Sequence, residues 1–434
     1  SGRASHFSEG AWGLIRVLDK ENKTLKPLPG HEEIPQSAKE VCPSDAPVKQ
    51  FNVSAIDYAL KFNKGTPSLM EVDLGRSLST ANENGKIYVM DDEINKVKGG
   101  MMSPNPLTLR VNVGDCIKIS LTNRMAKEHA GLHADMLAFD PKESMGINVG
   151  NNPGDQTIPP GNHRTYTFYA TPEYGENATA IQDWGNVVEN PRNGLYGSII
   201  IGPKGSKYVD PKTGEDVSMK NSWQADVIID RTIPGNENRV NYRDFALMFQ
   251  DEDNLMGTSF MPYAQKVAGL TGVNYRSEPM GYYLDNGCDV GMIFRCVADK
   301  GAINTPLLEA HAGDPVLIHV FGAFNEQVGV FALDGHEWPI DKFHGAHLHS
   351  SFEFGGTSYL RLDLRGGAGG PHHLPGDYVY MNHRPAYMDA GEWGIFRVLP
   401  VGDKRIHALN PVDSDIRSAE KPAPKQVSRE IHNP

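Results

Sequence analysis

The chain has 434 residues, with 42 Lys and Arg against 54 Asp and Glu, so its formal net charge is −12. This acidic balance disfavours nucleic acid or an anionic membrane surface as a partner. No apolar run approaches the roughly 20 residues of a membrane-spanning helix. The 45 Gly and 30 Pro favour many short strands and turns over long helices. We therefore expect two or three domains and no membrane span.

The segment 10–18 has the sequence GAWGLIRVL and returns at 391–399 as GEWGIFRVL, identical at six of nine positions. Both copies place an apolar run after a Trp-Gly corner, which is typical of a strand that closes a β-domain. We therefore expect residues 1–46 to form an N-terminal arm. The arm would carry the closing strand of a preceding domain, followed by a polar linker.

Two further repeats divide the rest of the chain. Residues 106–123 and 306–322 each read as an apolar strand, a Gly-Asp turn and a second strand. Residues 158–170 and 354–364 each read as a Gly turn followed by an alternating strand. The repeats predict two β-domains in series and a charged, Pro-containing tail. The expected boundaries are 47–202 for the first domain, 203–401 for the second and 402–434 for the tail.

One segment departs from the strand pattern. Phe245, Met248 and Phe249, with Leu255 after them, are spaced as on one face of a helix. This spacing predicts a helix within residues 242–280.

The four cysteines, Cys42, Cys116, Cys288 and Cys296, form no Cys-x-x-Cys or Cys-x-His pattern. They are either two disulfides or four buried thiols, and the short spacing favours a bridge between Cys288 and Cys296. A disulfide would indicate an oxidising compartment.

The order of the motifs is specific. A strand, a Gly-Asp turn, a His-bearing strand, a Pro-Gly turn, another strand, a loop and a closing Gly-x-Trp-Gly strand follow one another. This order resembles the cupredoxin domains of multicopper oxidases, including the ceruloplasmin type, and of two-domain copper nitrite reductases. The resemblance implies an all-β fold of tandem Greek-key cupredoxin β-sandwich domains, with the arm completing a further domain. It also implies a copper-linked oxidoreductase in an extracytoplasmic location, periplasmic or secreted.

Most copper ligands of that family are replaced in this chain. The family's closing loop carries His-Cys-His, an outer His and an axial Met, and the Cys thiolate binds a blue copper. Here Met381 and Asn382 stand in place of the first His and the Cys, while His383 keeps the third place. Tyr387 replaces the outer His, and Glu392 replaces the axial Met. The resemblance therefore implies that this domain forms no blue copper site.

Single histidines remain at other family positions. Where the family has His-x-His-Gly-His, Ala332 and Asp334 fill two places and only His336 is left. In the arm, His6 matches the outer blue-copper His and Ala11 the axial position.

More histidines follow His336 in the sequence. His344, His347 and His349 come within a short stretch, and on an extended strand His347 and His349 project from one face. Neutral imidazoles suit copper or zinc. The predicted metal ligands are His336, His347, His349, His383 and His6. The alternative is that these are loop histidines that bind no metal.

The first domain keeps His133, with Asp135 in the place of a second His. A His-x-Asp strand offers both side chains on one face. In a nitrite reductase-like site, a carboxylate beside a copper-bound His relays protons to the substrate. We therefore expect His133 and Asp135 to be catalytic, or else Asp135 only forms a hydrogen bond at a strand end.

Glu392 carries a further expectation. A carboxylate in the position of the family's axial ligand would be buried, and burial of a charge is costly unless the carboxylate pairs with a cation. Its expected partner is Arg384, Arg397 or an ion.

Three functions remain open. The first is a multicopper-oxidase-like, copper-linked oxidoreductase subunit or fragment. Its partner would be another polypeptide or cleaved fragment that completes the N-terminal cupredoxin domain and carries the redox copper, and an oligomer is compatible with this. The second is a cupredoxin scaffold without redox copper that serves structure or assembly. The third is a mononuclear copper- or zinc-binding protein that uses the His344–His349 region.

Overall fold

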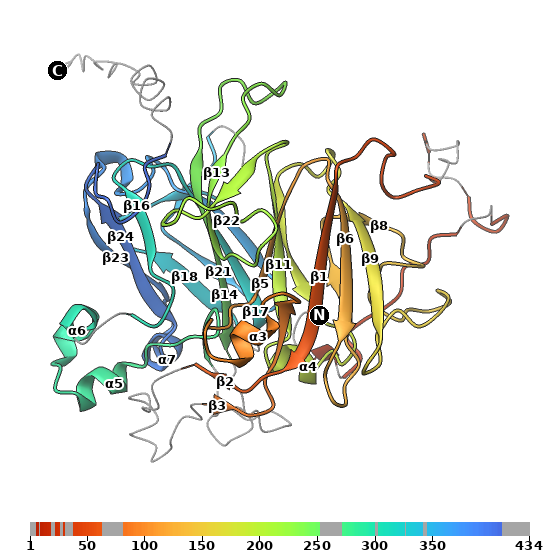
Figure 1. Ribbon diagram of the computed structural model, residues 1–434, viewed down its shortest axis with the longest axis horizontal. Helices are drawn as coiled ribbons and strands as arrows, with labels where there is room; N and C mark the ends of the chain where they lie inside the picture. Colours follow the sequence, from red (N-terminus) through yellow and green to blue (C-terminus); the bar gives the residue numbers. More distant parts are fainter. Residues whose placement is uncertain are drawn as a thin grey trace, which may run out of the picture.

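The molecule is built from two β-sandwiches that lie side by side (Figure 1). The computed structural model describes residues 6–7, 9–18, 22–26, 29–30, 38–62, 81–251, 271–299, 303–325, 327–341 and 345–409. Strands dominate these residues, so the predicted all-β fold class is confirmed. None of the helices in these ranges is long and apolar enough to cross a membrane.

The first sandwich packs a five-stranded sheet, β4-β1-β6-β9-β8, against a four-stranded sheet, β5-β11-β10-β7. Its core contains fully buried side chains from both sheets, among them Phe51, Ile119, Phe168 and Ile199. The strands are β1 (Val48–Asp57), β4 (Lys86–Met90), β5 (Leu107–Asn112), β6 (Cys116–Asn123), β7 (His133–Ala134), β8 (Ala138–Phe139), β9 (His163–Tyr169), β10 (Asn177–Gln182) and β11 (Tyr196–Gly202). Beside them lie the pair β2 (Leu60–Lys61) and β3 (Ala81–Asn82) and the short helices α3 (Ile94–Lys98) and α4 (Glu189–Arg192).

The second sandwich repeats this plan. One sheet has the order β12-β13-β14-β17-β22 with β15 on β14, and the other has the order β16-β24-β23-β18-β21. In both sandwiches, a strand in each sheet pairs in parallel with a strand from a distant part of the chain: β1 with β6, β5 with β11, β14 with β17, and β16 with β24. Parallel pairs need long connections, which here pass from one sheet to the other.

The strands of the second sandwich are β12 (Lys207–Val209), β13 (Gln224–Ile228), β14 (Tyr242–Asp251), β15 (Thr271–Val273), β16 (Leu308–His311), β17 (Val316–Asn325), β18 (Gly329–Leu333), β21 (Ser351–Phe354), β22 (Tyr359–Asp363), β23 (Gly376–Asn382) and β24 (Trp393–Leu399). A separate pair is formed by β19 (Trp338–Pro339) and β20 (Leu348–His349). The helices are α5 (Met280–Asp285), α6 (Ile293–Asp299) and α7 (Pro385–Ala390), with the 3₁₀ turns η1 (Val290–Met292) and η2 (Gly370–His372).

The repeated Gly-Asp turn joins equivalent strands in both sandwiches. Gly114 links β5 to β6 and Gly313 links β16 to β17, with φ of 92° and 81°. These positive values favour glycine because a Cβ would be strained there. The next residue closes each turn in the same way: a side-chain oxygen of Asp115 or Asp314 accepts a hydrogen bond from the backbone N–H three residues earlier, at 2.8 and 2.9 Å. The strand–turn–strand units predicted from this repeat are therefore present.

The predicted helix around residue 245 is wrong, because this segment is β14. β14 lies in the middle of its sheet and is buried on both faces. Phe245 and Phe249 face the core of the second sandwich, whereas Ala246 and Met248 face the first sandwich. A strand buried on both sides is a continuous apolar run, and such a run satisfies helical spacing by coincidence. Leu255 lies outside the described residues.

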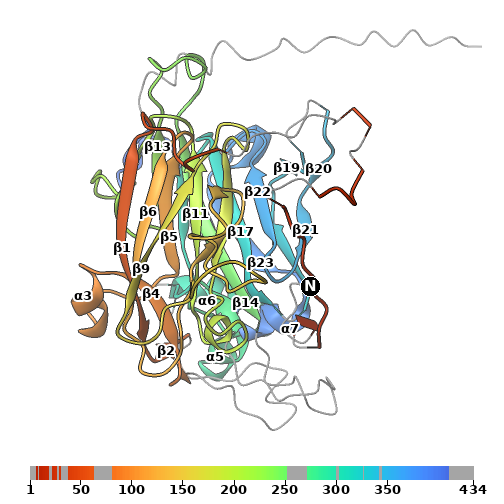
Figure 2. The same ribbon diagram turned by 90° about the vertical axis from the view of Figure 1, so that its right-hand side faces the viewer.

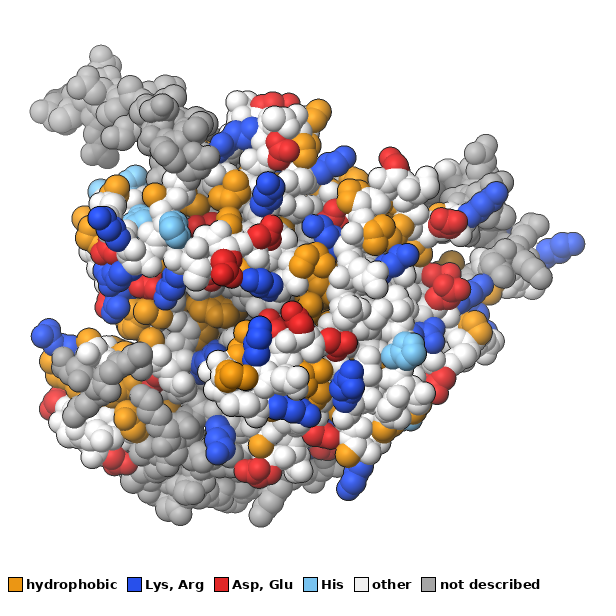
Figure 3. All heavy atoms as spheres, in the orientation of Figure 1, with side chains coloured by type: hydrophobic (Ala, Val, Ile, Leu, Met, Phe, Trp, Pro, Cys, Tyr) orange, Lys and Arg blue, Asp and Glu red, His pale blue; other side chains and the backbone are white. Residues whose placement is uncertain are grey.

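The two sandwiches share an apolar interface. Ile87, Val89 and Ile200 of the first sandwich pack in one buried cluster with Met248 and Phe321 of the second. Figure 2 shows the sheets of the two sandwiches stacked in succession. On the face seen in Figure 3, acidic and basic side chains are interspersed.

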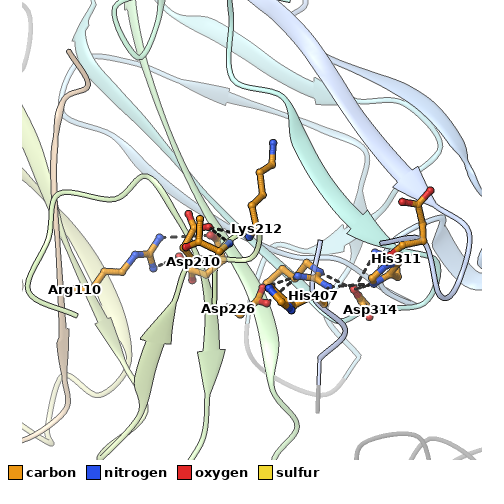
Figure 4. A network of polar contacts seen from close by, with 11 residues as sticks. Arg110, Asp210, Lys212, Asp226, His311, Asp314 and His407 are labelled. Atoms are coloured by element: carbon orange, nitrogen blue, oxygen red, sulfur yellow. Dashed lines mark hydrogen bonds and ion pairs between the residues drawn. The ribbon is translucent and has the colours of Figure 1, made fainter. Parts of the chain in front are cut away.

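A buried arginine fixes one end of the second sandwich. The Arg243 guanidinium donates from Nε to Asp314 at 2.6 Å, and from Nη1 to Asp226 at 2.7 Å. Its Nη2 donates to the backbone carbonyl of His407 at 2.7 Å. Figure 4 shows Asp226, Asp314 and His407 converging there. The network therefore ties residues that follow the last strand to the sheet, while residues 410–434 of the expected tail lie outside the described part.

All four cysteines form disulfides, Cys42 with Cys116 and Cys288 with Cys296. The first bridge joins the segment before β1 to the start of β6. The second bridge closes a short loop between α5 and α6. The favoured Cys288–Cys296 pairing is therefore present, and the alternative of four free thiols is excluded.

Candidate functional site

In the second sandwich, two residues that stand in place of the family's copper ligands by sequence resemblance form a buried hydrogen-bonded pair. Asn382, at the end of β23, donates from Nδ2 to Glu392 Oε2 at 2.7 Å. Its Oδ1 accepts from the backbone N–H of Val330 at 3.0 Å. Asn382 and Glu392 are completely buried, and Tyr387 is nearly so. The residues that replace the Cys, the outer His and the axial ligand thus form part of the packed interior.

Glu392 is a neutral acid in this setting. Burial raises its pKa well above the ordinary value, and the nearby Asp251 raises it further, while the Asn382 side chain and the Gly272 backbone offset part of this. The expected arginine partners are wrong. Arg397 binds Asp377 at 2.7 and 2.8 Å, and Arg384 donates to the carbonyl of Val328 at 2.8 Å. Both arginines lie toward the surface, whereas Glu392 points inward.

These residues do not fit a blue copper. Such a site needs a thiolate with imidazole ligands, and every cysteine of the chain is in a disulfide. Glu392 Oε1 has no hydrogen-bond partner among the described residues. The other carboxyl oxygen, Oε2, accepts a hydrogen bond from the amide of Asn382. The donor set around Asn382 and Glu392 therefore does not match that of a blue copper site.

His336 is buried and uses both ring nitrogens. Nδ1 donates to the carbonyl of Asp334 at 2.9 Å, and Nε2 accepts from the backbone N–H of Gly369 at 2.9 Å. Burial lowers the pKa of His336, so it stays neutral. The ring therefore holds the β18–β19 connection against the turn before η2 and presents no spare nitrogen to an ion.

The other predicted ligands of the second sandwich do not converge. His347 and His383 are exposed, and His349 lies beside the Phe352 ring at 5.5 Å. Within the described residues, no three His, Cys, Asp or Glu side chains come together as a metal-binding group. His344 lies outside the described residues. A metal site formed by His336, His347, His349 and His383 remains a prediction, because these side chains do not lie together in the described residues.

His133 and Asp135 lie together at the end of β7. His133 Nε2 is 3.1 Å from Asp135 Oδ1, and His133 Nδ1 donates to the carbonyl of Met145 at 2.7 Å. The hydrogen bond with His133 is the main cause that lowers the pKa of Asp135, whose side chain is 63% exposed. Because the Met145 carbonyl accepts from Nδ1, the ring is held with Nε2 toward the Asp135 carboxylate. The catalytic role of this pair stays a prediction.

The N-terminal arm packs near His133 through aromatic rings. The Phe7 ring lies edge-on to Trp184 at 5.4 Å, and Trp184 lies edge-on to His133 at 6.3 Å. His6, the predicted metal ligand of the arm, comes directly before Phe7 in the chain. It is therefore close in sequence to a ring that packs against Trp184, the neighbour of His133. Residues 11–18 of the arm are exposed and form neither helix nor strand, and Trp12, Ile15 and Val17 are 60%, 96% and 90% exposed.

One row of connected polar side chains was not predicted from the sequence. Arg110, Asp244, His319 and Tyr359 form consecutive contacts between the two sandwiches, although they come from four different strands. The available signal was His319, which interrupts the apolar run of β17. A histidine inside a buried strand needs a polar partner.

The fold is shared with known copper proteins. No family model and no curated protein sequence matches the chain. Among solved structures, a copper nitrite reductase from Nitrosomonas europaea is similar with a TM-score of 0.50 and 14% identity, covering 83% of this chain and 97% of the other. The multicopper oxidase mgLAC is similar with a TM-score of 0.50 and 15% identity, covering 82% of this chain and 87% of the other.

These likenesses define the class by fold: the chain has the tandem cupredoxin β-sandwich architecture of multicopper oxidases and copper nitrite reductases. The predicted resemblance to the cupredoxin superfamily is confirmed at the level of the fold.

Proposed function

We propose that this chain is a subunit or segment of a multicopper-oxidase-like, copper-linked oxidoreductase whose redox copper is held by a partner. The observation that carries the proposal is the Asn382–Glu392 pair, which fills the ligand position of the second sandwich, together with the lack of any free thiol. The copper oxidoreductase class is supported by the similar structures, which are a nitrite reductase and a multicopper oxidase. The two disulfides support an extracytoplasmic location.

The arm is the proposed link to the partner. Its counterpart β24 lies inside a sheet, pairing with β16 on one side and β23 on the other, and Trp393 is completely buried. The arm has the same Trp-Gly corner but exposes its apolar side chains. Apolar burial and backbone pairing both favour insertion of such a strand into an incomplete sheet. The partner would therefore be another polypeptide whose cupredoxin sheet lacks its closing strand.

Two aspartates placed in the arm test this link. Ile15→Asp with Val17→Asp should prevent strand insertion, because the charges would have to be buried without partners. The control is Val401→Asp, an equally exposed apolar position at 81% exposure outside the arm. The complex purified from its natural source should contain copper and a second polypeptide with the unaltered chain and with the control. Retention of both by the arm variant would contradict the proposal.

A scaffold role without copper is the runner-up. It is favoured by the same buried Asn382–Glu392 pair, because Asn382 uses both its amide nitrogen and its amide oxygen in hydrogen bonds within the protein, without a metal. A native complex that contains the partner but no copper would favour this scaffold over the oxidoreductase.

A mononuclear copper or zinc site is the third candidate, and one observation favours it at His133 and Asp135. The His133 Nε2 lies 3.1 Å from the Asp135 carboxylate, and Nδ1 is oriented by a backbone carbonyl. His6 would be the third ligand supplied by the arm. Zinc or copper titration of the isolated chain should then lose its binding heat in His133→Ala and keep it in His163→Ala, since His163 is an exposed histidine at the start of β9.

A further inference from the structure

A buried row of side chains crosses the interface between the two sandwiches and ends at a cleft. Arg110 Nη1 contacts Asp244 Oδ1 at 2.5 Å, and the other oxygen of Asp244 lies 2.8 Å from His319 Nε2. His319 Nδ1 lies 2.8 Å from the hydroxyl of Tyr359. The first three side chains are almost completely buried, while Tyr359 is partly exposed.

The protonation states of this row follow from its surroundings. Burial lowers the pKa of His319, so the ring is neutral despite the neighbouring carboxylate. Burial acts to raise the pKa of Asp244, but His319 and Arg110 outweigh it and hold the pKa below its ordinary value. An ionised Asp244 only accepts hydrogen bonds, so His319 Nε2 carries the proton and Nδ1 accepts from the Tyr359 hydroxyl. The hydroxyl proton of Tyr359 is thereby directed at His319, and the hydroxyl oxygen is left to accept hydrogen bonds, one of them from Arg361.

The cleft in front of Tyr359 has a volume of about 1050 Å³ and lies between β22, the β19 strand and the start of β10. Its apolar wall contains Ile340, Phe352 and Leu360. β19 and β22 lie next to each other in Figure 2 as well as in their contacts. The size is of the order expected for a small-molecule site. Charged and amide side chains make up half of the lining residues, so the cleft has a polar side and an apolar side.

Arg361 supplies the positive charge of the cleft. It stands directly across from His319 in the β17–β22 pairing and lines the cleft beside Tyr359. Among the described residues Arg361 forms no ion pair, whereas the second arginine of the cleft, Arg239, is held by both carboxylate oxygens of Glu176. A guanidinium fork fits a carboxylate with two parallel hydrogen bonds.

The acidic wall limits the ligand further. Asp341 and Asp363 also line the cleft, and a second negative charge on the ligand would be repelled by them. We propose that the cleft binds a small hydroxy-monocarboxylate with an apolar body. Its carboxylate lies on Arg361 and its hydroxyl donates to Tyr359, whose orientation is set by His319 and Asp244. This site is independent of the copper proposal, since it needs neither a metal nor the arm.

Calorimetric titration of the intact chain with four probes tests the site. Mandelate carries all three features, phenylacetate lacks the hydroxyl, benzyl alcohol lacks the carboxylate, and malate has a second carboxylate and no apolar body. Mandelate should bind most tightly, and phenylacetate about tenfold more weakly, as expected for one lost hydrogen bond. Benzyl alcohol and malate should give no measurable heat. Equal binding of malate and mandelate would overturn the proposal, as would no binding of mandelate.

Two variants separate the contacts. Arg361→Gln should abolish mandelate binding, and its matched control is Arg365→Gln, an exposed arginine just after the same strand. Tyr359→Phe should weaken mandelate to the level of phenylacetate and leave phenylacetate unchanged, a selective loss that misfolding would not produce. Equal losses for both probes, or unchanged mandelate binding in Arg361→Gln, would contradict the assigned roles.

Discussion

Replacing Glu392 by glutamine should change how stability depends on pH. Glu392 is completely buried and its folded-state pKa lies well above the ordinary 4.5. A carboxyl group whose pKa is raised by folding stabilises the folded state. This stabilisation is complete at pH values below the pKa that the group has in the unfolded state. That contribution is lost as the pH rises toward the folded value, because the folded state must then give up a proton it holds tightly.

The size of the effect follows from linkage. Each pH unit between the unfolded and folded pKa values of Glu392 removes about 1.4 kcal/mol from the stability of the unaltered chain. A glutamine side chain cannot titrate, so Glu392→Gln should become progressively more stable relative to the unaltered chain from about pH 5 upward. The amide oxygen of the new side chain can still accept from Asn382, so the polar contact at 2.7 Å is retained.

Urea unfolding at a series of pH values, followed by tryptophan fluorescence, measures this difference. Trp393 is buried next to Glu392 in sequence and reports on the same region. The control is Glu337→Gln, whose side chain is largely exposed and should give a curve parallel to that of the unaltered chain. Parallel curves for Glu392→Gln would refute the reasoning, since they would mean that Glu392 is ionised in the fold and stabilised by a cation.

Three other predictions concern the described contacts. Arg243→Met should lower the free energy of unfolding by about 3–5 kcal/mol, because two buried aspartates lose their cation; an unchanged urea midpoint would contradict this. Replacing Cys42 and Cys116 by Ser should cost about 4.4 kcal/mol, because this bridge closes a longer loop than the bridge whose cysteines are 8 residues apart, which should cost about 2.5 kcal/mol; the order of the two thermal midpoints checks this difference. Asp135→Asn should leave thermal stability nearly unchanged, because the side chain is 63% exposed, and a large drop in the melting temperature would assign it a structural role.

The sequence was sufficient for the repeated framework. A Gly-Asp turn needs a positive φ and a local side-chain hydrogen bond, and both requirements are met within a few residues of Gly114 and of Gly313. β14 was wrongly predicted as a helix, because an apolar run buried on both faces has no periodicity that distinguishes a strand from a helix.

Site residues were harder to predict, because their roles depend on distant parts of the chain. His336 looks like a ligand in the sequence, yet its second nitrogen is taken by the backbone of Gly369, which lies far along the chain. Glu392 was expected to meet an arginine, but its partner is the amide of Asn382 on the neighbouring strand. The Asp244–His319–Tyr359 row joins three strands, so no local pattern announces it.

The most direct test of the central claim is the visible spectrum and copper content of the isolated chain after incubation with copper and removal of the excess. With Asn382 in place of the thiolate and all cysteines in disulfides, the chain should show no blue copper–thiolate absorption and retain no copper in the second sandwich. An intense blue band from the chain alone would contradict the account.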